Sequence, residues 1–200
     1  MRLLGIVAVL LSGFAAAPAV ADEWVDEQQH GSFIFHADFP LKDVTSVVEG
    51  LGELQKDIEA TLGLKCGERE IHIHLFRTRW GYAQYIRRNV PEGAGRPALF
   101  VAGNDVGRVY AYRHRDLDVD LRHETTHALL HNALPYVPLW LDEGLAEYFE
   151  MPVNRRFDGS PHRRSLQWAI RFGWKPNLAA LEGNHTLSEM DGNDYRDAWG

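Results

Sequence analysis

The chain has 200 residues, of which 45% are hydrophobic, and its formal net charge at pH 7 is -7. This length and composition suffice for one globular domain with its own hydrophobic core. The acidic balance and the scatter of the basic residues argue against a nucleic-acid partner. The one cysteine, Cys66, excludes an intrachain disulfide, and we expect its thiol to be buried as a small hydrophobic side chain.

Residues 1–21 have the pattern of a secretory signal peptide. An apolar run from Leu3 to Phe14 follows a positively charged start, and Ala19-Val20-Ala21 fits the small-x-small cleavage rule. The run is too short to cross a bilayer as a helix, and no other stretch is apolar enough to do so. We therefore expect an exported protein, periplasmic or secreted, without stable membrane insertion, whose single mature domain spans 22–200.

The first half of the mature chain alternates between strand and helix patterns. Aromatic residues alternate with other side chains over Gly31 to Phe39, which predicts a strand. The next stretch, Leu41 to Leu62, has apolar residues at helical spacing and is followed by Gly63, so it predicts a long amphipathic helix. Strict alternation predicts another strand over Ile71 to Phe76, and a helix capped by Thr78 follows it.

His72 and His74 lie two residues apart and therefore share one face of the predicted strand. They could be metal ligands, but the sequence shows no third ligand beside them. We therefore predict partly exposed strand histidines rather than a metal site.

Two short strands are predicted over Ala98 to Ala102 and Arg108 to Tyr112, joined by turn residues. The second precedes a histidine-bearing helix, so it is a candidate edge strand that could offer backbone groups to an extended peptide. An ordinary structural hairpin is the alternative interpretation.

The sequence His123-Glu-Thr-Thr-His127 is the strongest chemical signal in the chain. Its two histidines are four residues apart, so on a helix they lie on one face and can bind one metal ion. Glu124 lies beside them, where it can act as a general base on a metal-activated water. The flanks predict a helix that Asp118 or Asp120 caps and that Pro135 ends.

A catalytic zinc usually needs a third protein ligand. His131 is eight residues from His123, about 12 Å along the helix axis, which is too far for one ion. A second predicted helix, Leu139 to Glu150, carries Glu143 and Glu147 one turn apart. One of these carboxylates can bind the metal while the other accepts the outer N–H of a ligating histidine.

This pair of helices resembles the gluzincin zinc peptidases, in particular the compact peptidase MA-like domains and the minigluzincins. The resemblance covers His123-Glu-Thr-Thr-His127 and Pro138-Leu-Trp-Leu-Asp-Glu-Gly-Leu-Ala-Glu-Tyr-Phe149. It implies Zn2+ as cofactor, Glu143 as third ligand and Glu147 as the residue that orients the first histidine. It also implies an oxyanion-stabilising residue in the C-terminal half, for which Tyr195 is the first candidate, ahead of Tyr112, His162 and His185.

The expected fold is α+β and zincin-like: a small mixed sheet has an edge strand packed beside the HExxH helix, and a second helix carries the glutamates. Two departures from the family stand out. The Gly-x-Met-Glu-Asn element of the aminopeptidases is absent, and the chain ends soon after Tyr195, as a minimal or truncated domain would.

We therefore expect an exported zinc peptidase that acts on a peptide or protein substrate, with Glu124 as its general base. A catalytically silent binding module and a zinc amidase acting on non-peptide bonds are the alternatives. The sequence does not determine the oligomeric state.

Overall fold

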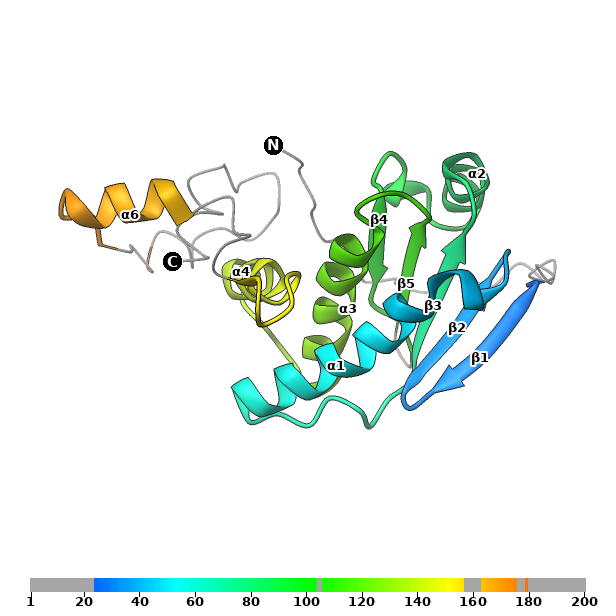
Figure 1. Cartoon of the computed structure of the whole chain (residues 1–200), viewed down its shortest axis with the longest axis horizontal. Coiled ribbons are helices and arrows are strands. Elements are labelled where there is room, and N and C mark those ends of the chain that lie inside the picture. The colour runs from blue at the N-terminus through cyan, green and yellow to red at the C-terminus, as the bar shows by residue number, and fades with distance from the viewer. Residues whose placement is uncertain (1–23, 104–105, 157–162, 176–178, 180–200) are drawn as a thin grey trace.

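The computed structural model describes residues 24–103, 106–156, 163–175 and 179, and it has an α+β fold built on a five-stranded mixed sheet (Figure 1). The strands are β1 (Asp26–His30), β2 (Phe33–Ala37), β3 (Ile71–Phe76), β4 (Ala98–Val101) and β5 (Gly107–Tyr112). The helices are α1 (Thr45–Leu62), α2 (Arg79–Asn89), α3 (Leu117–Ala133), α4 (Leu139–Phe149) and α6 (Arg163–Arg171), with short 3-10 helices at Leu41–Val44 and Pro91–Gly93. Within these residues, no helix is both long and apolar enough to cross a membrane.

The strand order across the sheet is β1-β2-β3-β5-β4. The three central strands are parallel, and β1 and β4 are antiparallel to their neighbours at the two edges. The prediction that Arg108 to Tyr112 forms the edge strand is therefore wrong, because this segment lies in β5, between β3 and β4. Since β5 pairs with β3 along its whole length, from Gly107 to Tyr112, its antiparallel neighbour β4 takes the edge position.

The two faces of the sheet are covered by different helices. In Figure 1, α1 and α3 lie across one face, and α4 packs on the far side of α3. The main core joins Phe33, Phe35, Ile71 and Ile73 of the sheet to Leu51, Leu54 and Ile58 of α1 and to Leu121 and Leu129 of α3. The α2 helix covers part of the opposite face through Tyr82 and Ile86, which pack with Leu99 and Tyr110. Because α3 lies between the sheet and α4, its motif can contact both.

Most local predictions are confirmed. The Thr78 hydroxyl accepts a hydrogen bond from the Gly81 N–H at the start of α2, and Gly63 closes α1 with a φ of 68°. Cys66 is fully buried. Strand β1 was not predicted, because Asp26–His30 is entirely polar and of low strand propensity. It pairs with β2 through a two-residue turn whose first residue, Gly31, has a φ of 62°.

The start of α3 differs from the prediction. The helix begins at Leu117, with Asp116 at its N-cap and no side-chain capping bond, so Asp118 and Asp120 lie inside the first turn instead of capping it. The positive end of the helix dipole still stabilises their negative charges. Asp120 also forms an ion pair of 3.0 Å with His114.

Several predicted elements lie outside the described residues: the signal peptide, the start of the helix that continues as α6, and the C-terminal segment with Tyr195. His162 and His185 lie there too.

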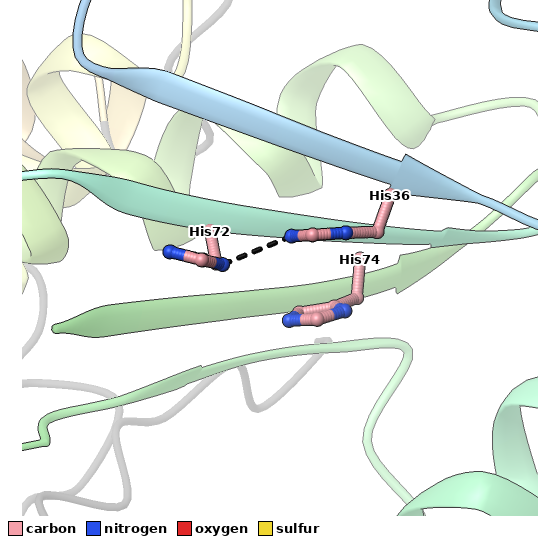
Figure 2. A group of neighbouring side chains, drawn as sticks. All are labelled: His36, His72 and His74. Carbon is pink, nitrogen blue, oxygen red and sulfur yellow. Dashed lines mark hydrogen bonds between the residues drawn. The ribbon is translucent and has the colours of Figure 1, made fainter. Parts of the chain in front are cut away.

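His72 and His74 have a third histidine beside them, contrary to the prediction. His36 of β2 lies next to both on the face of the sheet opposite α1 and α3 (Figure 2). It comes from another strand, 36 residues away from His72 along the chain, so sequence spacing could not reveal it. His72 is partly exposed as predicted, whereas His74 is buried, with 8% of its surface exposed.

Candidate metal centre

His123, His127 and Glu143 form a buried cluster between α3 and α4. One ligand atom from each lies within 4.8 Å of the other two, and no residue of the three is more than 1% exposed. The two histidines come from successive turns of α3, and their ring centroids are 4.9 Å apart. The short connection after Ala133 brings α4 back against α3, which places Glu143 opposite the histidines. The cluster thus brings together the three residues that the sequence analysis proposed as metal ligands.

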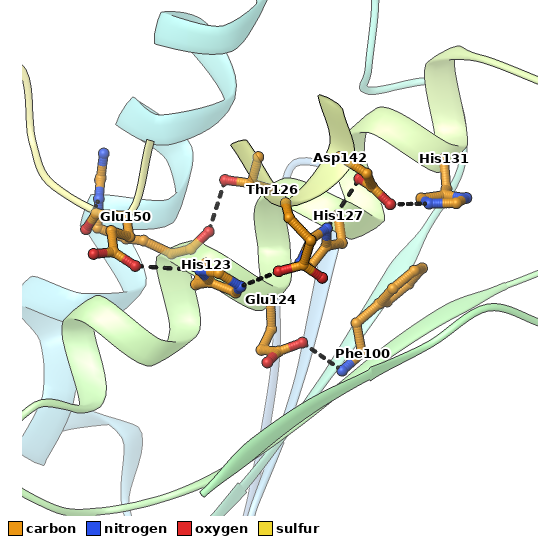
Figure 3. A network of polar contacts seen from close by, with 10 residues as sticks. Phe100, His123, Glu124, Thr126, His127, His131, Asp142 and Glu150 are labelled. Atoms are coloured by element: carbon orange, nitrogen blue, oxygen red, sulfur yellow. Dashed lines mark hydrogen bonds and ion pairs between the residues drawn. The ribbon is translucent and has the colours of Figure 1, made fainter. Parts of the chain in front are cut away.

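Each histidine is oriented through its Nδ1 atom by a carboxylate of the α4 segment (Figure 3). His123 Nδ1 lies 3.2 Å from Glu150 Oε2, and His127 Nδ1 lies 2.9 Å from Asp142 Oδ1. Because an ionised carboxylate can only accept, each Nδ1 carries the proton and donates it. Nε2 is therefore the ring atom of each histidine that can bind a metal ion once it carries no proton, and Glu143 Oε2 is 3.8 Å from His123 Nε2.

These contacts revise the predicted role of Glu147. The carboxylate on the first histidine is that of Glu150, one further turn along the same face and next to the end of α4. The sequence reasoning also missed Asp142, which accepts from His127 and, through Oδ2, from His131 Nε2 at 2.7 Å. The four-residue spacing of His127 and His131 could have indicated such a residue. It places the two rings one turn apart on α3, where one carboxylate can accept a hydrogen bond from each.

Burial and nearby carboxylates shift the pKa values of the two histidines in opposite directions. Burial alone would lower the pKa of His123, but its bond to Glu150 and the nearby Glu124 and Glu143 carboxylates raise that pKa to about 10. Burial lowers the pKa of His127 to about 4 despite Asp142, so this ring is neutral at pH 7, as a metal ligand must be. The proton on His123 is thus held by surrounding negative charge that a divalent ion can neutralise instead.

The donor set fits a divalent metal ion. Within the described part of the chain, neither His123 Nε2 nor His127 Nε2 has a hydrogen-bond partner, although both are buried. Unsatisfied buried nitrogens are rare and call for an explanation such as an ion. Two imidazole nitrogens with one carboxylate form a common ligand set of catalytic zinc sites, although other divalent metals accept it too.

Glu124 lies on the sheet side of α3. Its Oε2 accepts a hydrogen bond of 2.8 Å from the Phe100 N–H of the edge strand β4 (Figure 3). Burial raises the pKa of Glu124 to about 7, against the lowering effects of His123, the Phe100 N–H and Arg96. A carboxylate with a pKa near neutrality can both take up and release a proton at physiological pH.

A cavity of about 370 Å³ lies between α2, the loop before β4 and the end of β5. Its walls include Arg79, Tyr82, Arg87, Arg96, Tyr112 and His114. Two of these wall residues, Tyr82 and Arg96, also interact electrostatically with the Glu124 carboxylate. The cavity is therefore close enough to Glu124 for its walls to influence the charge of that side chain. Tyr112 belongs to this wall and not to the His123–His127–Glu143 cluster.

Comparison with models of known protein families and with curated protein sequences finds no match for this chain. The fold and the site together define an α+β protein with a buried two-histidine, one-carboxylate cluster and an adjacent glutamate at a sheet edge.

Proposed function

We propose that this protein is a metal-dependent hydrolase. More specifically, we propose an exported zinc peptidase of the gluzincin type, in which His123, His127 and Glu143 hold the ion and Glu124 moves the proton. The observation that carries the proposal is the position of Glu124: it adjoins the ligand cluster on α3 and also contacts the backbone of the edge strand. A substrate on that strand would therefore lie beside both the ion and the base.

The edge strand β4 offers backbone groups to a peptide. In an antiparallel pair, the N–H and C=O of one residue point to the same side, and successive residues alternate between the two sides. Since the Phe100 N–H reaches Glu124 and not β5, Phe100 and Ala98 direct their backbone groups outward, while Leu99 and Val101 bond to β5. An extended peptide can therefore add to this edge through Ala98 and the Phe100 carbonyl.

The chemistry divides between the ion and the protein. A bound zinc ion would supply a Lewis acid that activates water and polarises a carbonyl. Glu124 takes a proton from the attacking water and returns it to the leaving amine. Asp142 and Glu150 hold the two imidazoles in the tautomer that turns Nε2 toward Glu143. Burial of the whole cluster excludes bulk water, which strengthens each of these electrostatic interactions.

An unbiased peptide-library digest of the zinc-loaded chain tests this proposal. Mass spectrometry of the products should show a reproducible set of cleaved bonds, which disappears with a chelator and returns with added zinc. The same preparation is offered a set of non-peptide amides. Hydrolysis of these alone would replace the peptidase by an amidase, and peptide binding without cleavage would replace it by a binding module.

A further inference from the structure

His36, His72 and His74 gather on the sheet face opposite the cluster described above (Figure 2). Because β2 and β3 pair in parallel with His36 beside His74, and His72 lies two residues before His74, all three side chains project from the same face. One ring nitrogen from each lies within 4.8 Å of the other two. Three imidazoles are thus brought together by sheet register.

Carboxylates contact or approach the outer nitrogens of the two half-buried rings. His36 Nδ1 lies 2.5 Å from Glu27 Oε1, and His72 Nε2 lies 4.0 Å from Glu70 Oε2. The inner atoms, His36 Nε2 and His72 Nδ1, face each other at 2.9 Å and share one proton between two lone pairs (Figure 2). Metal-ligating histidines typically have a carboxylate on the remote nitrogen, which fixes the tautomer and raises the basicity of the ligand.

His74 supplies an independent observation. Its side chain is buried, and neither of its ring nitrogens has a hydrogen-bond partner among the residues that the structure describes. Its ring stacks between those of His36 and Tyr110, with both centroid distances 4.7 Å. Stacking accounts for the position of the ring but leaves both nitrogens unsatisfied, and a buried polar atom without a partner destabilises the folded chain.

We propose that His36, His72 and His74 form a second metal site, separate from the α3 cluster, which binds one late first-row divalent ion. Imidazole ligands suit Zn2+, Ni2+ and Cu2+, and the usual order of stability predicts the tightest binding for Cu2+. The ion takes the place of the proton between His36 and His72, which moves to His72 Nε2 on the side of Glu70, and it gives a buried nitrogen of His74 a partner.

Ligation requires a modest rearrangement. The ring of His36 makes angles of 17° and 12° with those of His72 and His74, so the rings must turn for their lone pairs to converge. The second side-chain torsion of histidine has a broad energy profile, which makes such a turn inexpensive. Arg108, opposite His72 on β5, is exposed, and the two carboxylates outweigh its single positive charge. The bound ion would link β2 to β3.

Equilibrium dialysis of the full chain against Cu2+ alone, and separately against Zn2+ alone, tests the proposal. His74→Phe keeps the aromatic stack but removes the ligand, and His72→Gln is a second variant at a more accessible position. His30→Gln changes an exposed histidine of β1 outside the cluster and is the matched control. Each cluster variant should bind one ion fewer than the parent, whereas His30→Gln should bind as many.

The same measurement in a His123→Ala, His127→Ala chain separates the two sites. We expect one remaining Cu2+ ion there, with an electron paramagnetic resonance spectrum showing coupling to three imidazole nitrogens. Adding His74→Phe should weaken its binding more than about 100-fold, since losing even a carboxylate partner of a ligand weakens metal binding about 10–100-fold. Unchanged stoichiometry and spectrum in folded His74→Phe and His72→Gln chains would overturn the second site. A loss confined to these variants supports it even if the α3 cluster binds nothing.

Discussion

Asp142→Asn tests how far the α4 carboxylates hold the proposed ligands in place. Asp142 is 3% exposed and accepts from His127 at 2.9 Å and from His131 at 2.7 Å. Asparagine keeps the shape but has one accepting oxygen, so it can serve only one of the two rings, and its NH2 group faces the other N–H. Losing the carboxylate partner of a metal-ligating histidine weakens metal binding about 10–100-fold, or about 1.4 to 2.8 kcal/mol.

The assay is a competition titration of Zn2+ against a chelator of known affinity. It is made in a His74→Phe background so that the measured Zn2+ binding comes from the α3 cluster alone. His131→Gln is the matched control, because it removes the second ring and leaves the bond between Asp142 and His127 intact. We expect less than a tenfold loss in the control. If a folded Asp142→Asn chain binds Zn2+ as tightly as the parent, Asp142 does not orient His127 for a metal.

Three further predictions address the ligand set, the thiol and the edge strand. Glu143→Ala should lose stoichiometric Zn2+ in plasma emission analysis of the same background, whereas Glu147→Ala should keep it; the reverse pattern would exchange their roles. Burial, assisted by Glu59, raises the pKa of Cys66 to about 11, so a disulfide reagent at pH 8 should label the thiol only in denaturant, and rapid labelling of the folded chain would contradict its burial. Ala98→Pro removes an outward N–H and should lower peptide affinity while the fold is kept, whereas unchanged affinity would exclude β4 as the peptide platform.

Local sequence patterns predicted most of the elements because their causes are local. Alternation over Ile71 to Phe76 placed β3 at the observed boundaries, and helical spacing placed α1. The capping role of Thr78 follows from its own hydroxyl and the three residues after it. The pairing of strands has no such local cause, so the position of β5 inside the sheet was not predictable from the hairpin pattern alone.

The candidate site shows the same division. The four-residue spacing of His123 and His127 determines their shared face. Glu143 could be predicted as a third ligand because it belongs to the next helix along the chain. The contacts of Asp142 and Glu150 depend on how α4 is rotated and how far it extends along α3, which no spacing within one helix specifies. His36 belongs to the same class, because only the register between β2 and β3 brings it to His74.

The turnover number of Glu124→Gln is the most direct test of the proposed chemistry. Glutamine preserves the size and polarity of the side chain but cannot take the proton, so the variant should fold and hold Zn2+ as the parent does. With a substrate from the library digest, kcat should fall by roughly 100-fold or more, while substrate affinity changes little. Equal turnover by the parent and a zinc-loaded Glu124→Gln chain would contradict Glu124 as the general base.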